Sequence, residues 1–184
     1  MTHTMKALGA IGKEVRRRAR ISLKARGKYV TGKLYNSIGY EQYVSRSEKS
    51  LMLTFSFVGA EYWKYVDLGV QGAISSAKAP RSPFRFGTGT GPEGGLRPAI
   101  DRWVIKKGLK GTRNAKGQFT PRKSMVYAIS NSIYRTGIKP SYFFTNAYDK
   151  TLKKNNKNLL TAIGLDVGAA TAEILKSLKL SSPT

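Results

Sequence analysis

One stretch of ten residues, 60–69, limits the folds open to this chain more than any other. It reads Ala-Glu-Tyr-Trp-Lys-Tyr-Val-Asp-Leu-Gly, follows a strand-like run and ends at a glycine. Each of its aromatic rings has a large apolar area to bury, so a core must form around them. Asp67 lies among these rings, and a buried carboxylate needs a partner. The stretch predicts a structural crossing point, where a hairpin, a helix and a neighbouring surface meet.

The charge balance points to the kind of partner. The 184 residues fit one domain, 1–184, and they include 33 Lys and Arg against 10 Asp and Glu, a formal net charge of +23. Such an excess repels itself and favours a polyanionic partner. Nucleic acid and an acidic protein surface both satisfy this requirement, and composition does not choose between them.

Several function classes are excluded by missing residue types. The chain has no cysteine and a single histidine, His3 at the N-terminus. Disulfides, thiol nucleophiles, Cys-ligated metals and a Ser-His-Asp triad in the body of the fold are therefore excluded. The carboxylates are scattered without paired spacing, with Asp67 and Asp101 the least unsuitable acid–base candidates. We expect no enzymatic activity, no cofactor and no bound metal.

No membrane or export segment is expected. We find no apolar run near the ~20 residues of a membrane helix, and the first residues lack a signal peptide's apolar core. The protein is expected to stay in the compartment in which it is made.

The N-terminal part predicts a basic amphipathic helix over residues 5–26. An apolar stripe at helical spacing comprises Leu8, Ile11, Val15, Ala19 and Leu23. The remaining surface is basic and includes Lys13, Arg16, Arg17, Arg18, Arg20 and Lys24. That surface is either a solvated face or a docking face for phosphates and carboxylates.

The next segments predict a helical turn and a hairpin. Turn residues Thr31-Gly32 precede Leu34 and Ile38, whose spacing of four suits a short helical turn. Residues 39–44 and 51–58 are the strands, and the second alternates apolar and polar positions. Residues 45–50 are the polar connector between these strands. A lone hairpin is only marginally stable, so the first helix is expected to cover it.

Residues 70–98 read as a long loop rich in Gly, Ser, Pro and Thr. No Gly-Lys-Ser/Thr ending supports a nucleotide-binding loop. Phe84 and Phe86 either stack on nucleic acid or pin the loop to a protein surface.

The C-terminal half predicts further helices. Helices are expected over 98–107 and 121–136, the latter with one face formed by Met125, Ile129, Ser132 and Ile133. After Pro140, an aromatic cluster is expected to begin a last helix, capped by Ser141 and bent at Gly164 and Gly168. Its buried residues are expected to include Tyr142, Phe143, Ala147 and Tyr148. The predicted fold class is α+β, with the basic helix on a small antiparallel sheet, a long insertion at about 70–136 and C-terminal helices.

Three segments together resemble a known family. Residues 30–38, Val-Thr-Gly-Lys-Leu-Tyr-Asn-Ser-Ile, are similar to its T-G-x-L-x-x-S-I element. Residues 60–69 are similar to its Y-x-x-Y-V-E-F-G element, and residues 138–149 to its closing proline-aromatic element. An Arg-Pro-Ala at Arg97–Ala99 offers a second position for the closing element. In this order, after a basic helix, the segments resemble the head–tail joining or tail-completion (neck) proteins of tailed bacteriophages.

The resemblance implies a structural virion protein without enzymatic activity. Copies would form a ring that joins or completes the portal–tail connection in the neck, after synthesis in the host cytoplasm. The implied partners are further copies, portal or adaptor proteins, tail terminator or tube proteins, and the genomic DNA where the ring meets it; no membrane is implied. The basic residues of the first helix and of 106–123 would meet acidic faces. The interface candidates are Arg16, Arg17, Arg20, Lys24, Gly32, Leu34, Tyr62, Tyr65, Asp67, Gly69, Phe84, Phe86, Pro140, Phe143 and Phe144.

The alternative is a nucleic-acid-binding module without enzymatic activity. Aromatic residues interleaved with Lys and Arg favour it. The spread of basic residues over the whole chain and the lack of a base-reading motif favour the neck protein.

Overall fold

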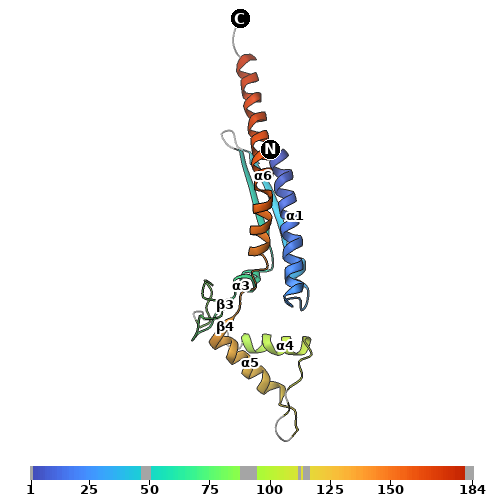
Figure 1. The fold of residues 1–184 in the computed structure, drawn as a ribbon, viewed down its shortest axis with the longest axis vertical. Coiled ribbons are helices and arrows are strands. Elements are labelled where there is room, and N and C mark those ends of the chain that lie inside the picture. Colours follow the sequence, from blue (N-terminus) through green and yellow to red (C-terminus); the bar gives the residue numbers. More distant parts are fainter. Residues whose placement is uncertain (1, 47–50, 88–94, 112, 114–116, 181–184) are drawn as a thin grey trace. The chain divides into compact units, whose positions relative to one another are not determined.

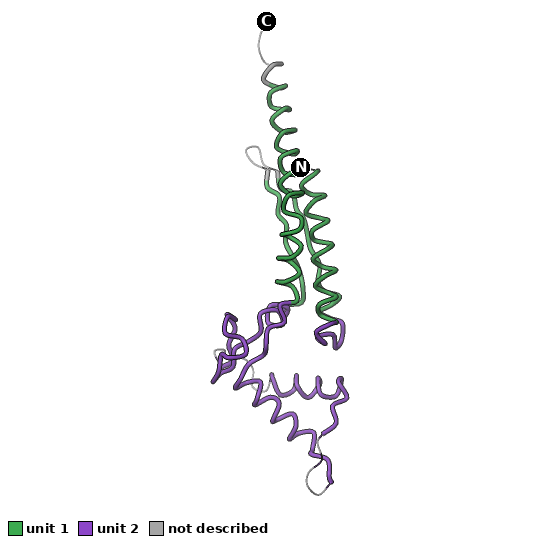
Figure 2. Tube along the Cα trace, in the orientation of Figure 1, with its two compact units in different colours: residues 1–24, 34–60, 143–184 green, residues 25–33, 61–142 purple. Residues whose placement is uncertain are grey.

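The computed structural model describes residues 2–46, 51–87, 95–111, 113 and 117–180. Parts of three expected segments lie outside them: 47–50 of the connector, 88–94 of the loop, and 112 and 114–116 of the basic segment. Helices and a small antiparallel sheet make the α+β fold class that the sequence predicts. The chain divides into two compact units, residues 1–24, 34–60 and 143–184, and residues 25–33 and 61–142 (Figure 2).

Unit 1 is a two-stranded sheet covered by two helices. Helix α1 (Thr2–Ala25) and helix α6 (Thr145–Leu180) lie alongside strands β1 (Gly39–Arg46) and β2 (Leu51–Val58) (Figure 1). The strands pair antiparallel, from Gly39 opposite Val58 to Arg46 opposite Leu51. This is the hairpin that the alternation predicts.

The core of unit 1 follows the predicted stripe of α1. Ile11, Val15, Ala19 and Leu23 are each at most 3% exposed. From the sheet, Tyr40 and Phe55 lie 5.8 Å apart between ring centroids, and Phe57 packs edge-on against Phe144 before α6 at 5.0 Å. One face of the hairpin is thus covered, while Tyr43 and Met52 on its other face remain exposed.

A carboxylate from α6 caps the N-terminus of α1. Asp166 accepts hydrogen bonds from the backbone N–H groups of Thr4 (2.8 Å) and His3 (3.2 Å), donors that a helix leaves without an internal partner. Burial of the Asp166 carboxyl raises its pKa, but these hydrogen bonds outweigh burial and the net pKa is lowered. The cap fixes how far α1 is shifted along α6.

Within the described residues, unit 2 consists of three helices and two short strands. It contains α3 (Trp63–Leu68), β3 (Val70–Gln71), α4 (Leu96–Lys106), α5 (Arg122–Thr136) and β4 (Gly137–Ile138). Strands β3 and β4 pair antiparallel, Val70 opposite Ile138 and Gln71 opposite Gly137. The expected loop over 70–98 therefore begins with a strand and gives way to α4 at Leu96.

The remaining short helix, α2 (Lys33–Ser37), is the predicted turn after Gly32.

Two local expectations need correction. In α5 the buried positions are Val126 and Ser130, one position from the predicted stripe, of which Met125, Ile129 and Ile133 are half-buried and Ser132 is exposed, because the helix packs on α4. Helix α6 is continuous from Thr145 to Leu180, so Gly164 and Gly168 do not interrupt it.

Two side chains at the start of α6 also differ from expectation. The helix begins three residues after the position that a Ser141 cap requires, and the Ser141 hydroxyl instead donates to the carbonyl of Val66 at 2.6 Å. Tyr148 is 36% exposed, although its ring lies perpendicular to that of Phe57 and stacks on that of Phe144. Phe143 and Ala147 are buried as expected, and Tyr142 is half-buried.

The close contact between α1 and the sheet generates a stability prediction. A Cβ at Gly12 would lie 2.6 Å from Cγ of Tyr40, whereas one at Gly9 would lie 3.6 Å from Nε2 of Gln42. Gly12→Ala should lower the free energy of unfolding by about 1–3 kcal/mol through overpacking. Gly9→Ala, the matched control, should be neutral or raise it by up to ~1 kcal/mol through helix propensity. Urea unfolding measures both, and equal effects would contradict the packing.

Candidate functional site

The second and third segments of the family resemblance meet at a backbone junction in unit 2. The N–H of Ser141 donates to the carbonyls of Val66 (3.2 Å) and Asp67 (3.0 Å), and the N–H of Tyr142 donates to that of Asp67 at 2.9 Å. We call residues 66–69 and 138–142 the base junction. Its hydrogen bonds hold together two segments that are more than 70 positions apart in the chain.

A glycine makes the base junction possible. Gly69 has a φ of +74°, and a Cβ there would lie 2.5 Å from the carbonyl oxygen of Ile138 and 2.7 Å from the nitrogen of Pro140. Only glycine fits this conformation at this distance. Asp67 is 1% exposed, so its side chain belongs to the interior of unit 2, as the sequence predicts.

The first resemblance segment is joined to the second within unit 1. The N–H of Ala60 donates to Oγ of Ser37 at 2.9 Å, and this hydroxyl donates to the carbonyl of Leu34 at 2.9 Å. Leu34 is buried. Gly32, which belongs to unit 2, has a φ of +74° and lies beside the hydroxyl of Tyr29. The segment 138–149 contacts residues 60–69 through Ser141 and Tyr142.

The aromatic candidates divide into buried and exposed rings. Phe143 is fully buried and Phe144 half-buried in unit 1. In unit 2, Tyr65 packs on Phe84 with ring centroids 4.3 Å apart, and Phe86 lies 6.1 Å from Tyr134. The two phenylalanines therefore pin the loop to the protein's own surface. Tyr62 and Tyr65 keep 39% and 46% of their surface exposed and are available to a partner.

Two residues of the basic face of α1 are engaged with the segment that precedes β1. Arg20 donates to the carbonyls of Asn36 (3.2 Å) and Ile38 (3.3 Å) and lies over the ring of Tyr35, with Lys24 also 4.9 Å from that ring's centroid. These cation–π contacts fasten α1 to the segment before β1. Arg16 is exposed.

An acidic residue neutralises part of the remaining face. Glu14 accepts from Nε of Arg17 at 2.7 Å and from Nε of Arg18 at 2.6 Å. The hydrogen bond from Arg17 lowers the pKa of Glu14, partial burial raises it, and Arg18 lowers it further, with a net result of about 2. The net positive charge of this face is therefore smaller than the count of its basic residues suggests.

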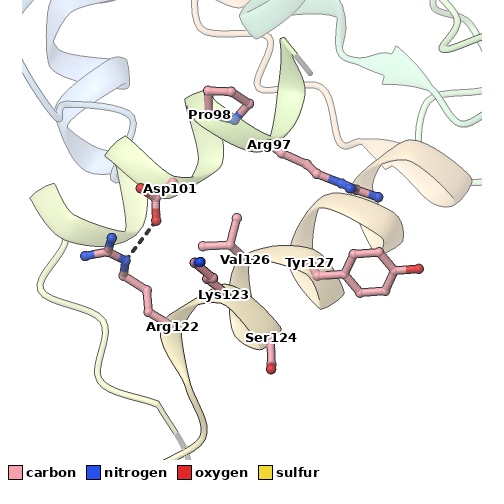
Figure 3. A pocket seen from close by; sticks show the side chains of 8 residues that line it. All are labelled: Arg97, Pro98, Asp101, Arg122, Lys123, Ser124, Val126 and Tyr127. Carbon is pink, nitrogen blue, oxygen red and sulfur yellow. Dashed lines mark ion pairs between the residues drawn. The ribbon is translucent and has the colours of Figure 1, made fainter. Parts of the chain in front are cut away.

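A second basic site, not identified from the sequence, lies between α4 and α5. A cavity of about 640 Å³ is lined by Arg97, Pro98, Asp101, Arg122, Lys123, Ser124, Val126 and Tyr127 (Figure 3). Nε of Arg122 lies 2.9 Å from the Asp101 carboxylate, and Arg97 lies over the ring of Tyr127 at 4.8 Å. One carboxylate against three cations leaves a positive cleft that suits a carboxylate or a phosphate group. In the sequence, only the basic segment 106–123 pointed to some of the lining residues. Arg97 and Tyr127 are far apart in the chain, and only the packing of α4 on α5 brings them together.

The structure places both acid–base candidates of the sequence. Asp101, one of the two acid–base candidates, is held in an ion pair, and the other, Asp67, is buried. Among the residues that the structure describes, no group of three or more His, Asp or Glu side chains is placed to hold a metal ion.

The expectation that no segment has the length and composition of a membrane helix is wrong. Residues 145–177 of α6 contain an 18-residue window with a mean hydropathy of 1.3, of which 11% is buried. Length and composition alone are weak evidence of a membrane span. The finding does identify a long, exposed apolar helix.

Comparisons of the chain with models of protein families, with curated proteins and with solved structures give no match.

The base junction predicts that the insertion can be removed. Gln71 and Gly137 face each other in an antiparallel pair, so a two-residue Asn-Gly turn in place of residues 72–136 would complete a hairpin. The shortened chain should keep the helices of unit 1 and unfold cooperatively, as measured by circular dichroism during thermal unfolding. The same deletion with Ser141→Ala should be less stable by about 1–3 kcal/mol, because the hydroxyl bond to Val66 is lost. A shortened chain that does not unfold cooperatively would contradict the prediction that the base junction holds without the insertion.

The Glu14 ion pairs predict a local pH dependence. Because the pKa of Glu14 is lowered to about 2 in the folded chain, its contribution is complete above the unfolded pKa of ~4.3 and is lost as the pH falls towards 2. Partly exposed pairs of this kind contribute less than about 1 kcal/mol. Urea unfolding from pH 6 to pH 2.5 should show a smaller loss of stability for Glu14→Gln than for the wild type. Glu61→Gln, at an exposed position, is the control and should leave the wild-type loss unchanged.

Proposed function

We propose that the chain is a structural protein of the neck of a tailed bacteriophage, where copies form a ring that joins or completes the connection between portal and tail. The observation that carries this proposal is the way the three resemblance segments are joined. Ser37 binds Ala60, and Ser141 binds Val66, so residues that resemble family elements also contact one another. A chance likeness of three separate peptides would not require such contacts.

The position of the insertion supports the same proposal. Residues 70–136 exceed what compact members of the family contain, and they leave and return at the base junction, where Gly69 touches Ile138 and Pro140. An insertion closed at its base can extend a family fold without disturbing the rest. Its exposed side chains are suited to reaching a neighbouring protein.

Binding in the neck would rest on shape and positive potential. The cleft between α4 and α5 would accept acidic side chains of a portal, adaptor, terminator or tube protein through Arg97 and Lys123. Arg16 on α1 would add to the same attraction, or meet the genomic DNA that passes through the ring. The proposed place of action is the virion.

A nucleic-acid-binding module is the second candidate, and two contacts favour it. Arg97 lies over Tyr127, and Arg113 over Phe119 at 4.6 Å, with both rings more than half exposed. Such pairs can stack on bases while the guanidinium neutralises phosphate.

Electron microscopy and binding to duplex DNA separate the two functions. For the neck protein we expect purified chains to form closed rings in negative stain and to be present in assembled virions. Monomers at all concentrations, together with absence from virions, would overturn the proposal.

The DNA arm uses a short duplex at several salt concentrations. Tight binding by monomers, with a steep fall in affinity as salt rises, would favour the nucleic-acid module. Weak binding that Arg97→Ala and Arg113→Ala do not change would exclude it.

A further inference from the structure

The last part of α6 exposes a large apolar surface. Between residues 158 and 175 only Ala162 and Asp166 are buried against the rest of unit 1. Six large apolar side chains in this range are 40–60% exposed, namely Leu160, Ile163, Leu165, Val167, Ile174 and Leu175. We call residues 158–175 the apolar segment. A helix that is apolar on its solvent side is normally covered by something.

The exposed side chains lie on both sides of the buried face. At 100° per residue, Ile163, Val167 and Ile174 lie on one flank of that face, with Leu160 beside them. Leu165 lies on the other flank. Between the flanks, opposite the buried face, are Gly164, Gly168, Thr171 and Leu175, and an added Cβ at either glycine would meet no other atom within 4 Å. The small residues between the flanks leave room for a neighbouring helix on each side.

The spacing is that of helix–helix packing. Leu160, Val167 and Ile174 are seven residues apart, and Ile163 lies three positions after the first of them, as in the apolar seam of a coiled coil. The apolar segment spans only about two and a half heptads, or ~27 Å of helix. One such seam is short for a stable pair, so association would use both flanks of each helix.

The charge pattern favours a second copy of this chain as the occupant. From residue 158 to 175 there is no Lys or Arg, although the whole chain has 33. The only charged residues of this stretch are Asp166 and Glu173, so the cationic repulsion between copies of a +23 chain has no source within it. An acidic protein or a nucleic acid would be attracted instead to the basic surfaces described above.

A lipid bilayer fits the apolar segment less well. The carboxylate of Asp166 lies in the middle of it and binds the N–H groups of His3 and Thr4, so the first turn of α1 is fastened there. The lowered pKa of Asp166 keeps the group charged. A membrane span would place this charge and the end of α1 within hydrocarbon.

We infer that the apolar segment packs side by side with the same segment of two neighbouring copies, the Ile163–Val167–Ile174 flank of one against the flank of the next that carries Leu165. Unlike flanks meet in a head-to-tail arrangement, which closes into a ring by rotation. The inference deepens the proposed function and rests on the ring that it contains. It assigns the ring contact to a surface outside the three resemblance segments.

Paired cysteines test which flanks meet. The chain has no cysteine, so introduced thiols have no native competitor. Leu165→Cys with Val167→Cys places one thiol on each flank, and under oxidation the double variant should form a ladder of covalent multimers on a non-reducing gel. Either single variant should remain largely uncrosslinked. Crosslinked dimers from Val167→Cys alone would show a symmetric pair and overturn the head-to-tail arrangement.

A matched control lies three helical turns earlier. Lys154→Cys with Asn156→Cys has the same spacing and nearly the same two directions around α6, and both positions are exposed. It lies in the basic part of the helix, outside the apolar segment. It should give no ladder, and a ladder equal to that of the first pair would overturn the inference.

Charge variants separate this inference from the proposed function. Val167→Lys with Ile174→Lys should weaken self-association at least tenfold in sedimentation experiments, with an unchanged thermal unfolding midpoint for the dissociated chain. Wild-type and variant rings of equal stability would overturn the inference and leave the neck proposal standing. A wild type that stays monomeric and uncrosslinked at high concentration would overturn the inference, and together with absence from virions it would also overturn the neck proposal.

Flotation with lipid vesicles tests whether the apolar segment binds a bilayer instead. The wild type should not float with neutral phosphatidylcholine vesicles, in which basic residues gain no electrostatic attraction. Flotation of the wild type that the two lysines abolish would assign the segment to a bilayer and overturn the inference.

Discussion

The rest of unit 2 depends on the close approach of two backbone segments at Gly69. A side chain there would collide with Ile138 and Pro140, so the contact exists only because the residue is glycine. The approach allows Ser141 and Tyr142 to bind the carbonyls of Val66 and Asp67. The chain thus returns, after about 70 residues, to the point from which it left. The stretch 60–69 is therefore where the chain enters the insertion and where residues 138–142 return to it.

A second constraint is the positive charge, which the fold meets in three ways. Glu14 forms ion pairs with two arginines of α1, and Arg20 and Lys24 lie over the ring of Tyr35. Asp101 forms an ion pair with one of the cations between α4 and α5. In the apolar segment, Lys and Arg do not occur.

Pattern and local chemistry predicted most of unit 1. The stripe of α1 and the alternation of β2 are properties of single elements, so periods of 3.6 and 2 were enough to find them. The face of α5 and the role of Ser141 were predicted wrongly, because both depend on segments distant in sequence. Val126 is buried only because α4 packs there, and the Ser141 hydroxyl finds Val66 rather than its own helix. The cleft with Arg97 and Tyr127 needed that same packing.

The sequence by itself determined the α+β class, the basic helix over a hairpin, and the exclusion of thiol and His-based chemistry, since composition and periodicity act locally. Tertiary structure decided which charges are engaged and where the insertion closes. It also decided that the apolar segment of α6 is exposed rather than buried. An apolar run is equally compatible with a core, a bilayer or another copy, and only the placement of its neighbours shows which of its faces are already covered.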